Sequence, residues 1–126
     1  MDDFFEPIAI EIEQSLLGLG DGLIEYVIGK TADSNSRECD YNNKGFTHFC
    51  EILSGKPEII NFGEKYLIEY FMNHSILKDS LGNERDGGAG NTEADTLYVV
   101  TKNTEKDINC IDGSILPNKY PIILDR

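Results

Sequence analysis

Residues 4–28 read FFEPIAIEIEQSLLGLGDGLIEYVI, and their apolar pattern changes its period at the glycines. Before the glycines, apolar residues recur at the spacing of an amphipathic helix, namely Phe5, Ile8, Ala9, Ile12, Leu16 and Leu19. After the glycines, the run is rich in β-branched and aromatic residues, which is typical of a largely buried strand. We therefore predict a helix over 4–19 followed by a strand over 23–28.

The rest of the chain contains signals for both kinds of element. We predict, in order, a polar loop over 30–45, a short helix over 46–53, a longer helix over 62–77 capped by Asn61 and Glu64, a mobile glycine-rich loop over 82–95, and strands over 96–101, 108–111 and 120–124. Helices dominate the first half of the chain and strands the second. This segregation predicts an α+β fold, with N-terminal helices packed on a small, mostly antiparallel sheet.

Length and composition indicate one globular domain over 1–126. Apolar residues make up 40% of the chain and charged residues 27%, which is close to the average of folded proteins. The acidic N-terminus does not read as a secretory signal, and no apolar run approaches the length of a membrane span, so we expect a cytoplasmic protein with no membrane contact.

The three cysteines, Cys39, Cys50 and Cys110, form an odd and widely spaced set, for which we expect reduced thiols. Together with His48 they lack the spacing that places ligands on one zinc ion, so we expect no metal and no cofactor. A Cys50 nucleophile beside His48 or His74 is the one thiol mechanism to consider, and it requires a histidine within hydrogen-bond reach of the thiol, which a sequence does not show.

Two glycine-rich runs do not carry a recognisable site. The run 18–22 follows a helix and precedes a strand, which reverses the order found in nucleotide-binding turns. The run 87–91 resembles a single copy of a calcium-binding repeat, and one copy cannot build the stacked sites that hold the ion.

The net charge of −12 excludes some partners and favours others. Direct binding of nucleic acid is disfavoured, because its affinity comes mainly from Lys and Arg at phosphates. The same field attracts a basic protein and speeds its docking. Residues 1–30 contain seven acids and one base, which is half of the whole negative excess in about a quarter of the chain.

The predicted first helix carries a mixed acidic and apolar face opposite its apolar stripe. Glu6, Ile10, Glu13 and Leu17 share this side, where an ordinary surface helix is only polar. Two interpretations stay open: a binding surface, or a helix buried on both sides between layers. For the first, we expect the partner-binding residues to be Glu6, Ile10, Glu11, Glu13, Leu17, Asp21 and Glu25.

In its general character the chain resembles the immunity proteins that protect bacteria from nuclease-type toxins of contact-dependent or other polymorphic toxin systems. The shared features are short length, strong acidity, cytoplasmic signals and the lack of a catalytic motif, and they extend over the whole chain. The resemblance implies a non-catalytic inhibitor that binds a cognate basic toxin domain and occludes its active site.

Two other functions are kept as alternatives. The first is a nucleic-acid mimic whose carboxylates imitate the spacing of phosphates; it calls for acids in two rows, which residues 31–126 do not obviously supply. The second is a small enzyme or ligand-binding domain built on the Tyr-rich helix 62–77, with the glycine loop as a lid. A deep polar pocket lined by Tyr66, Tyr70 and His74 would favour the second.

Overall fold

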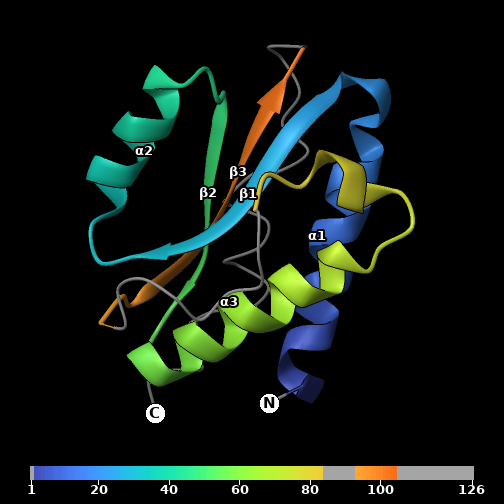
Figure 1. Ribbon diagram of the computed structural model, residues 1–126. Coiled ribbons are helices and arrows are strands. Elements are labelled where there is room, and N and C mark those ends of the chain that lie inside the picture. The colour runs from blue at the N-terminus through green and yellow to red at the C-terminus, as the bar shows by residue number, and fades with distance from the viewer. Residues whose placement is uncertain (1, 84–92, 105–126) are drawn as a thin grey trace.

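The computed structural model describes residues 2–83 and 93–104 as a three-stranded antiparallel sheet with helices packed on it (Figure 1). The elements follow in the order α1 (Asp2–Gly18), η1 (Gly20–Gly22), β1 (Leu23–Thr31), α2 (Ser34–Asn43), β2 (His48–Ser54), α3 (Pro57–Met72), η2 (Leu77–Ser80) and β3 (Thr96–Asn103), where η marks a short 3₁₀ helix. β3 lies between β1 and β2 and is antiparallel to both. The predicted α+β fold is confirmed. The strands predicted over 108–111 and 120–124, and with them Cys110, lie outside the described residues.

The first predicted helix is confirmed nearly to its ends, and the first predicted strand lies wholly within β1. α1 ends at Gly18, and its whole apolar stripe is buried, from Phe5 with no exposed surface to Leu19 at 5%. β1 begins at Leu23 as predicted and continues three residues past Ile28, to Thr31. Sequence periodicity therefore identified the segment that packs most deeply in the fold.

The polar stretch 30–45 was wrongly predicted to be a loop, because it contains α2. The helix begins after Asp33, whose side chain accepts a hydrogen bond from the backbone N–H of Ser36 at 3.1 Å. This is an ordinary N-cap, and it satisfies one of the free donors in the first turn. α2 has no buried residue and so presents no apolar stripe to a periodicity search.

The segment 46–53 was predicted to be a helix. This prediction is wrong, because the segment forms a strand, β2, over His48–Ser54. Its pairing with β3 shifts between Glu51 and Leu53, where a bulge adds one residue to the strand. As a result Ile52 and Leu53 are both buried, and the alternation of a strand is lost. Without that alternation, the spacing of the apolar residues in this segment resembles the spacing of an amphipathic helix.

The predicted helix 62–77 both begins and ends five residues earlier than expected, as α3 over Pro57–Met72, and Leu77 belongs to η2. Pro57 occupies the start of α3, where its missing N–H is harmless, so the proline opens this helix and does not close the one before it. Asn61 and Glu64 lie inside α3 and are not caps. They hold Lys30 of β1, whose Nζ donates to Asn61 Oδ1 at 2.5 Å and lies 3.6 Å from Glu64 Oε1.

α1 and α3 cover one face of the sheet and form the main core with it (Figure 1). The inward side chains of the strands alternate as expected, with Tyr26 and Ile28 from β1 and Leu97 and Val99 from β3. The two helices approach closely at Gly63, where any side chain would collide with the ring of Phe5.

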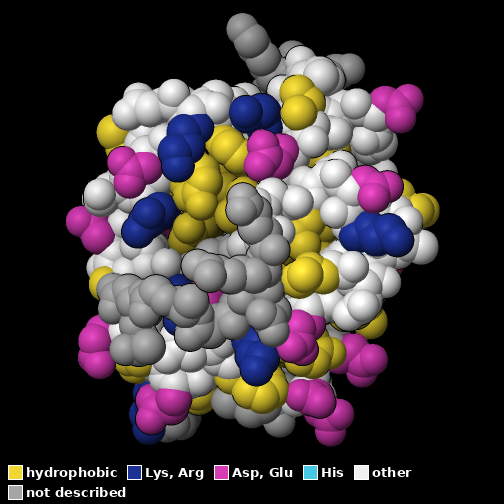
Figure 2. Space-filling model, viewed as in Figure 1, with side chains coloured by type: hydrophobic (Ala, Val, Ile, Leu, Met, Phe, Trp, Pro, Cys, Tyr) yellow, Lys and Arg dark blue, Asp and Glu magenta, His cyan; other side chains and the backbone are white. Residues whose placement is uncertain are grey.

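The other face of the sheet carries a smaller aromatic cluster beside α2. Tyr98 and Phe46 are buried in it, and Phe49 stacks on Tyr98 with 4.7 Å between ring centroids. The Tyr98 ring lies across Gly29 of the neighbouring strand, so closely that no side chain fits there. Figure 2 shows an apolar patch between α2 and the sheet with Lys and Arg side chains around it.

The outer edge of β1 is partly covered by the segment that follows η2. The backbone N–H of Gly82 donates to the carbonyl of Tyr26 at 2.8 Å. The side-chain amide of Asn83 then accepts from the N–H of Ile28 at 3.0 Å and donates to its carbonyl at 2.9 Å. The mobile loop predicted over 82–95 is therefore fixed at its first two residues, and its centre, 84–92, lies outside the described residues.

No helix within 2–83 or 93–104 is long and apolar enough to cross a lipid bilayer.

Candidate functional site

The outer face of α1 is open to solvent. Glu6 is exposed, and the exposed fractions of Ile10 and Leu17 are 39% and 41%, although both are large aliphatic side chains. The helix therefore packs on one side only within the described residues, which contradicts the interpretation of a helix buried between two layers. An exposed acidic side chain on the same face as two uncovered aliphatic ones makes a surface suited to protein contact.

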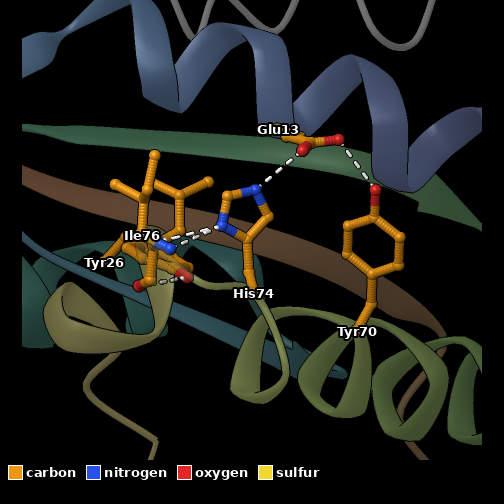
Figure 3. A network of polar contacts seen from close by, with 6 residues as sticks. Glu13, Tyr26, Tyr70, His74 and Ile76 are labelled. Carbon is orange, nitrogen blue, oxygen red and sulfur yellow. Dashed lines mark hydrogen bonds and ion pairs between the residues drawn. The ribbon is translucent and has the colours of Figure 1, made fainter.

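Glu13 differs from its neighbours on α1 because both of its carboxylate oxygens are bound within the chain (Figure 3). The hydroxyl of Tyr70 donates to Oε1 at 2.7 Å, and the Nε2 of His74 lies 2.7 Å from Oε2. Both partners come from the C-terminal end of α3 and the turn after it. Glu13 thus connects α1 to α3 and is turned away from the free face.

The hydrogen bonds around His74 involve both of its ring nitrogens. Its Nδ1 accepts from the backbone N–H groups of Ile76 at 3.1 Å and Leu77 at 3.0 Å. Since a backbone N–H can only donate, Nδ1 is the acceptor of the ring, and Nε2 is the nitrogen that donates to Glu13. The ring therefore has no free lone pair with which to act as a general base.

The network shifts the pKa values of its acidic members in opposite directions. The hydrogen bond from Tyr70 lowers the pKa of Glu13, partial burial opposes that shift, and the hydrogen bond from His74 lowers the pKa further. Burial, followed by the bond to Glu13 and its charge, raises the pKa of Tyr70 to about 12. Glu13 is thus a charged acceptor and Tyr70 a neutral donor at neutral pH.

The acids at the N-terminal end of α1 gather near a second tyrosine of α3. Burial raises the pKa of Tyr66, and the charges of Glu6, Asp2 and Asp3 raise it further, which places these three carboxylates near its ring. Figure 2 shows acidic side chains collected at the lower right of the molecule, over this end of α1. Asp2 and Asp3 belong to this acidic end and were not among the predicted binding residues.

The remaining predicted residues do not join one continuous surface. Glu11 is only half-exposed and lies five residues from Glu6, which is roughly 140° around the helix. Glu25 is half-buried on β1, opposite Lys102 of β3. Asp21 is exposed in η1, just beyond the end of α1. The structure therefore groups Glu6, Ile10 and Leu17 with Asp21 at their end, and separates Glu11 and Glu25 from them.

A small hollow lies at this end of α1. Its volume is about 190 Å³, and two of the predicted residues, Leu17 and Asp21, line it. Ile76, whose exposed fraction of 63% is the highest of the large apolar side chains in the described part of the chain, lines the opposite side. No sequence pattern pointed to Ile76, since it stands alone between α3 and η2 without a periodic neighbour.

The residues considered for chemistry are placed apart from this hollow. Tyr66, Tyr70 and His74 do not line it. Cys39 is exposed on α2 and Cys50 is buried in β2. Among residues 2–83 and 93–104, no three His, Cys, Asp or Glu side chains are grouped as a metal site.

Comparison with protein-family models, with curated proteins and with solved structures found no match to this chain.

Proposed function

We propose that this chain is a non-catalytic acidic binding protein that neutralises a basic protein partner, in the manner of an immunity protein that inhibits a cognate nuclease-type toxin by occluding its active site. The proposal places it in the cytoplasm, without direct binding of nucleic acid or membrane. One observation carries it: Ile10 and Leu17 stand uncovered on the same face as Glu6, in the segment that holds half of the net charge.

The binding surface in this proposal is narrower than the sequence indicated. It consists of Glu6, Ile10 and Leu17 on α1 with Asp21 in η1, and we call it the α1 face. Its acids attract a basic partner and orient it, and its aliphatic side chains are buried after docking. Glu13 contributes charge to the field, but its oxygens are bound by Tyr70 and His74, so it holds the surface in place.

Charge reversal on two different surfaces tests the proposal. The variant Glu6→Lys with Asp21→Lys changes the α1 face. The matched control, Glu38→Lys with Asp40→Lys, makes the same change in net charge on exposed positions of α2. Glu13 is left unchanged, because its reversal would break the contact with α3. Each form is used to capture partners from the native host, and the captured protein is identified by mass spectrometry. That protein is then purified, and its rate of association with each form is measured.

The proposal expects a basic protein whose association with the wild type is slowed strongly by the α1-face variant and only slightly by the α2 control. The difference should shrink at high salt, because exposed charges are screened. Nuclease activity of the captured protein should fall as the wild type is added, reaching its minimum at equal amounts. Equal effects of the two variants on a captured partner would contradict the α1 face and support the nucleic-acid mimic.

The alternative of a small enzyme or ligand-binding domain on the Tyr-rich helix has less support. The hollow described above is not lined by Tyr66, Tyr70 or His74, so it does not supply the pocket that this alternative calls for. The arrangement of His74 leaves neither ring nitrogen free to take a proton from a substrate.

A further inference from the structure

The hollow at the end of α1 has apolar walls and one charged group. Leu16 and Leu17 of α1, Leu23 of β1, and Ile76 and Leu77 before and within η2 supply the walls. Asp21 is the charged side chain among its lining residues, and none of them is a Lys or an Arg. Gly20 and Ser80 complete the lining. A group that fills this hollow therefore meets mainly hydrocarbon, with the carboxylate of Asp21 as its charged contact.

The size of the hollow limits what enters it. Binding pockets for drug-sized ligands have volumes of about 300–1,000 Å³, while an apolar cavity of about 150 Å³ accepts one benzene ring. At about 190 Å³, this hollow has room for a single side chain. A side chain of a protein partner is thus a better fit than a free metabolite.

The local charge favours a cation. Asp21 is exposed at the mouth, and the last turn of α1 contains no basic residue to offset the negative end of its helix dipole. η2 carries one base and one acid, Lys78 and Asp79, both exposed and neither lining the hollow. The net negative field of the chain adds to this preference.

The wall formed by Ile76 and Leu77 is held in position by the network in Figure 3. His74 accepts the N–H groups of both residues, and Glu13 fixes His74 in turn. On the other side, the hydroxyl of Tyr26 donates to the carbonyl of Leu77 at 2.9 Å. The exposed side chain of Ile76 therefore projects from a backbone that is fixed before any partner arrives.

We propose that this hollow receives one lysine or arginine side chain of the basic protein partner. The methylene groups of that side chain lie between Leu17 and Ile76, and its charged end meets Asp21. Lys and Arg side chains bury their stems against apolar surface while their charges stay near water, as this geometry requires. The inference rests on the proposed function and adds to it the place where an anchoring residue of the partner binds.

Three short peptides test the hollow without knowledge of the partner. They are acetyl-Gly-Arg-Gly-amide and its counterparts with citrulline, which is uncharged, and with norleucine, which is wholly apolar. Each is titrated into the full chain while methyl NMR signals of Leu17, Leu23 and Ile76 are followed. The Asp21→Asn variant removes the carboxylate of the hollow, and the matched control Asp79→Asn removes an exposed carboxylate that does not line it.

The arginine peptide should shift these methyl signals saturably and bind about two- to fivefold more tightly than the citrulline peptide, the range expected for an exposed ion pair. Asp21→Asn should abolish the difference and Asp79→Asn should preserve it. Norleucine binding equal to or tighter than arginine binding would overturn the preference for a cation. No saturable shift with any peptide would overturn the hollow as a side-chain site.

These outcomes are separate from the test of the proposed function. If the hollow fails while the α1-face reversals still slow capture of a basic partner, the anchor inference is wrong and the binding role stands. If the peptides bind but those reversals have no effect on partner association, the binding role fails and the hollow remains a site for a cationic side chain.

Discussion

Glu13 is the residue whose role changes most between sequence and structure. On the helical pattern it belongs to the exposed face, but it lies at the flank of that face, close enough to α3 to be bound by Tyr70 and His74. The spacing of residues within one helix does not show which of its sides a second helix will cover. The contact of Glu13 with α3 therefore could not be predicted from the sequence. Helical spacing did place Ile10 and Leu17 correctly, because their position depends on α1 alone.

Replacing Glu13 by Gln tests this role through pH. The pKa of Glu13 is lowered in the folded chain, so its contribution to stability is present above the ordinary value of about 4.3 and is lost as pH falls through the lowered value. Near neutral pH we expect Glu13→Gln to reduce the free energy of unfolding by about 1–2 kcal/mol, because a charge-assisted bond is lost and the new amide N–H₂ faces Nε2–H.

Urea unfolding at a series of pH values measures the effect. The gap between wild type and Glu13→Gln should close as pH falls through the lowered pKa of Glu13, since the wild-type carboxyl is then protonated as well. The exposed Glu69 of α3 provides the control, because Glu69→Gln should leave the curve nearly unchanged. A gap that persists undiminished into acid would show that charge at Glu13 does not stabilise the fold.

Gly63→Ala sets helix propensity against packing. In an exposed helix interior, Ala is more stable than Gly by about 1 kcal/mol. At Gly63 the added methyl would collide with the buried ring of Phe5, and overpacking typically costs about 1–3 kcal/mol. We expect a net loss of stability and a lower unfolding midpoint. The exposed Lys65→Ala, two residues away, should be nearly neutral; a stabilised Gly63→Ala would show that α1 and α3 separate easily.

At the scale of elements, the sequence predicted well where one periodicity runs undisturbed. α1, β1 and β3 have regular patterns and were found. β2 was read as a helix because the bulge at Glu51–Leu53 removes its alternation, and a bulge depends on pairing with a strand that is distant in sequence. α2 was missed because it buries no residue, although Asp33 is of a type favoured at the start of helices.

We expect substitutions on the two sides of α1 to differ in their effect on stability. Leu16 has 1% of its surface exposed and Leu17 has 41%, although they are adjacent. Leu16→Ala should reduce the free energy of unfolding by about 2–5 kcal/mol through loss of core packing. Leu17→Ala should change it by no more than about 0.5 kcal/mol.

Thermal and urea unfolding of the free chain decide this comparison. Partner binding adds a second readout, in which Leu17→Ala should mainly speed dissociation, because a buried apolar contact acts after encounter. Comparable destabilisation by the two variants would mean that Leu17 is a core residue and that the α1 face is not free.

Over the whole molecule, two surface regions differ in character. The acidic end of α1 and the apolar patch beside α2 lie on different parts of the surface, and Lys44 and Lys102 stand over the rings of Tyr41 and Phe46 in that patch. The net charge of −12 could be read from the sequence. The separation of these two regions could not, because it depends on how α2 packs beside one face of the sheet. A basic partner is therefore drawn more strongly to the acidic end of α1 than to that patch.

Asn83 is predicted to limit self-association of the whole molecule. Asn83→Ala would remove both hydrogen bonds to Ile28 and expose a stretch of β1 backbone. We expect a larger fraction of dimers or higher oligomers in Asn83→Ala than in the wild type, most clearly at high salt, where repulsion between acidic copies is screened. Analytical ultracentrifugation measures this, and identical profiles for the two proteins would contradict it.

The carboxamide of Asn83 works because it offers one donor and one acceptor, as a peptide group does, and so stands where the strand of another copy would otherwise add. Aspartate at the same position keeps the acceptor and loses the donor, and it sets a negative charge against the carbonyl of Ile28. Spontaneous loss of the amide nitrogen would make this same change in an ageing molecule. Deamidation of Asn83 is therefore expected to uncover the edge of β1 at Ile28 and to favour self-association, as Asn83→Ala does.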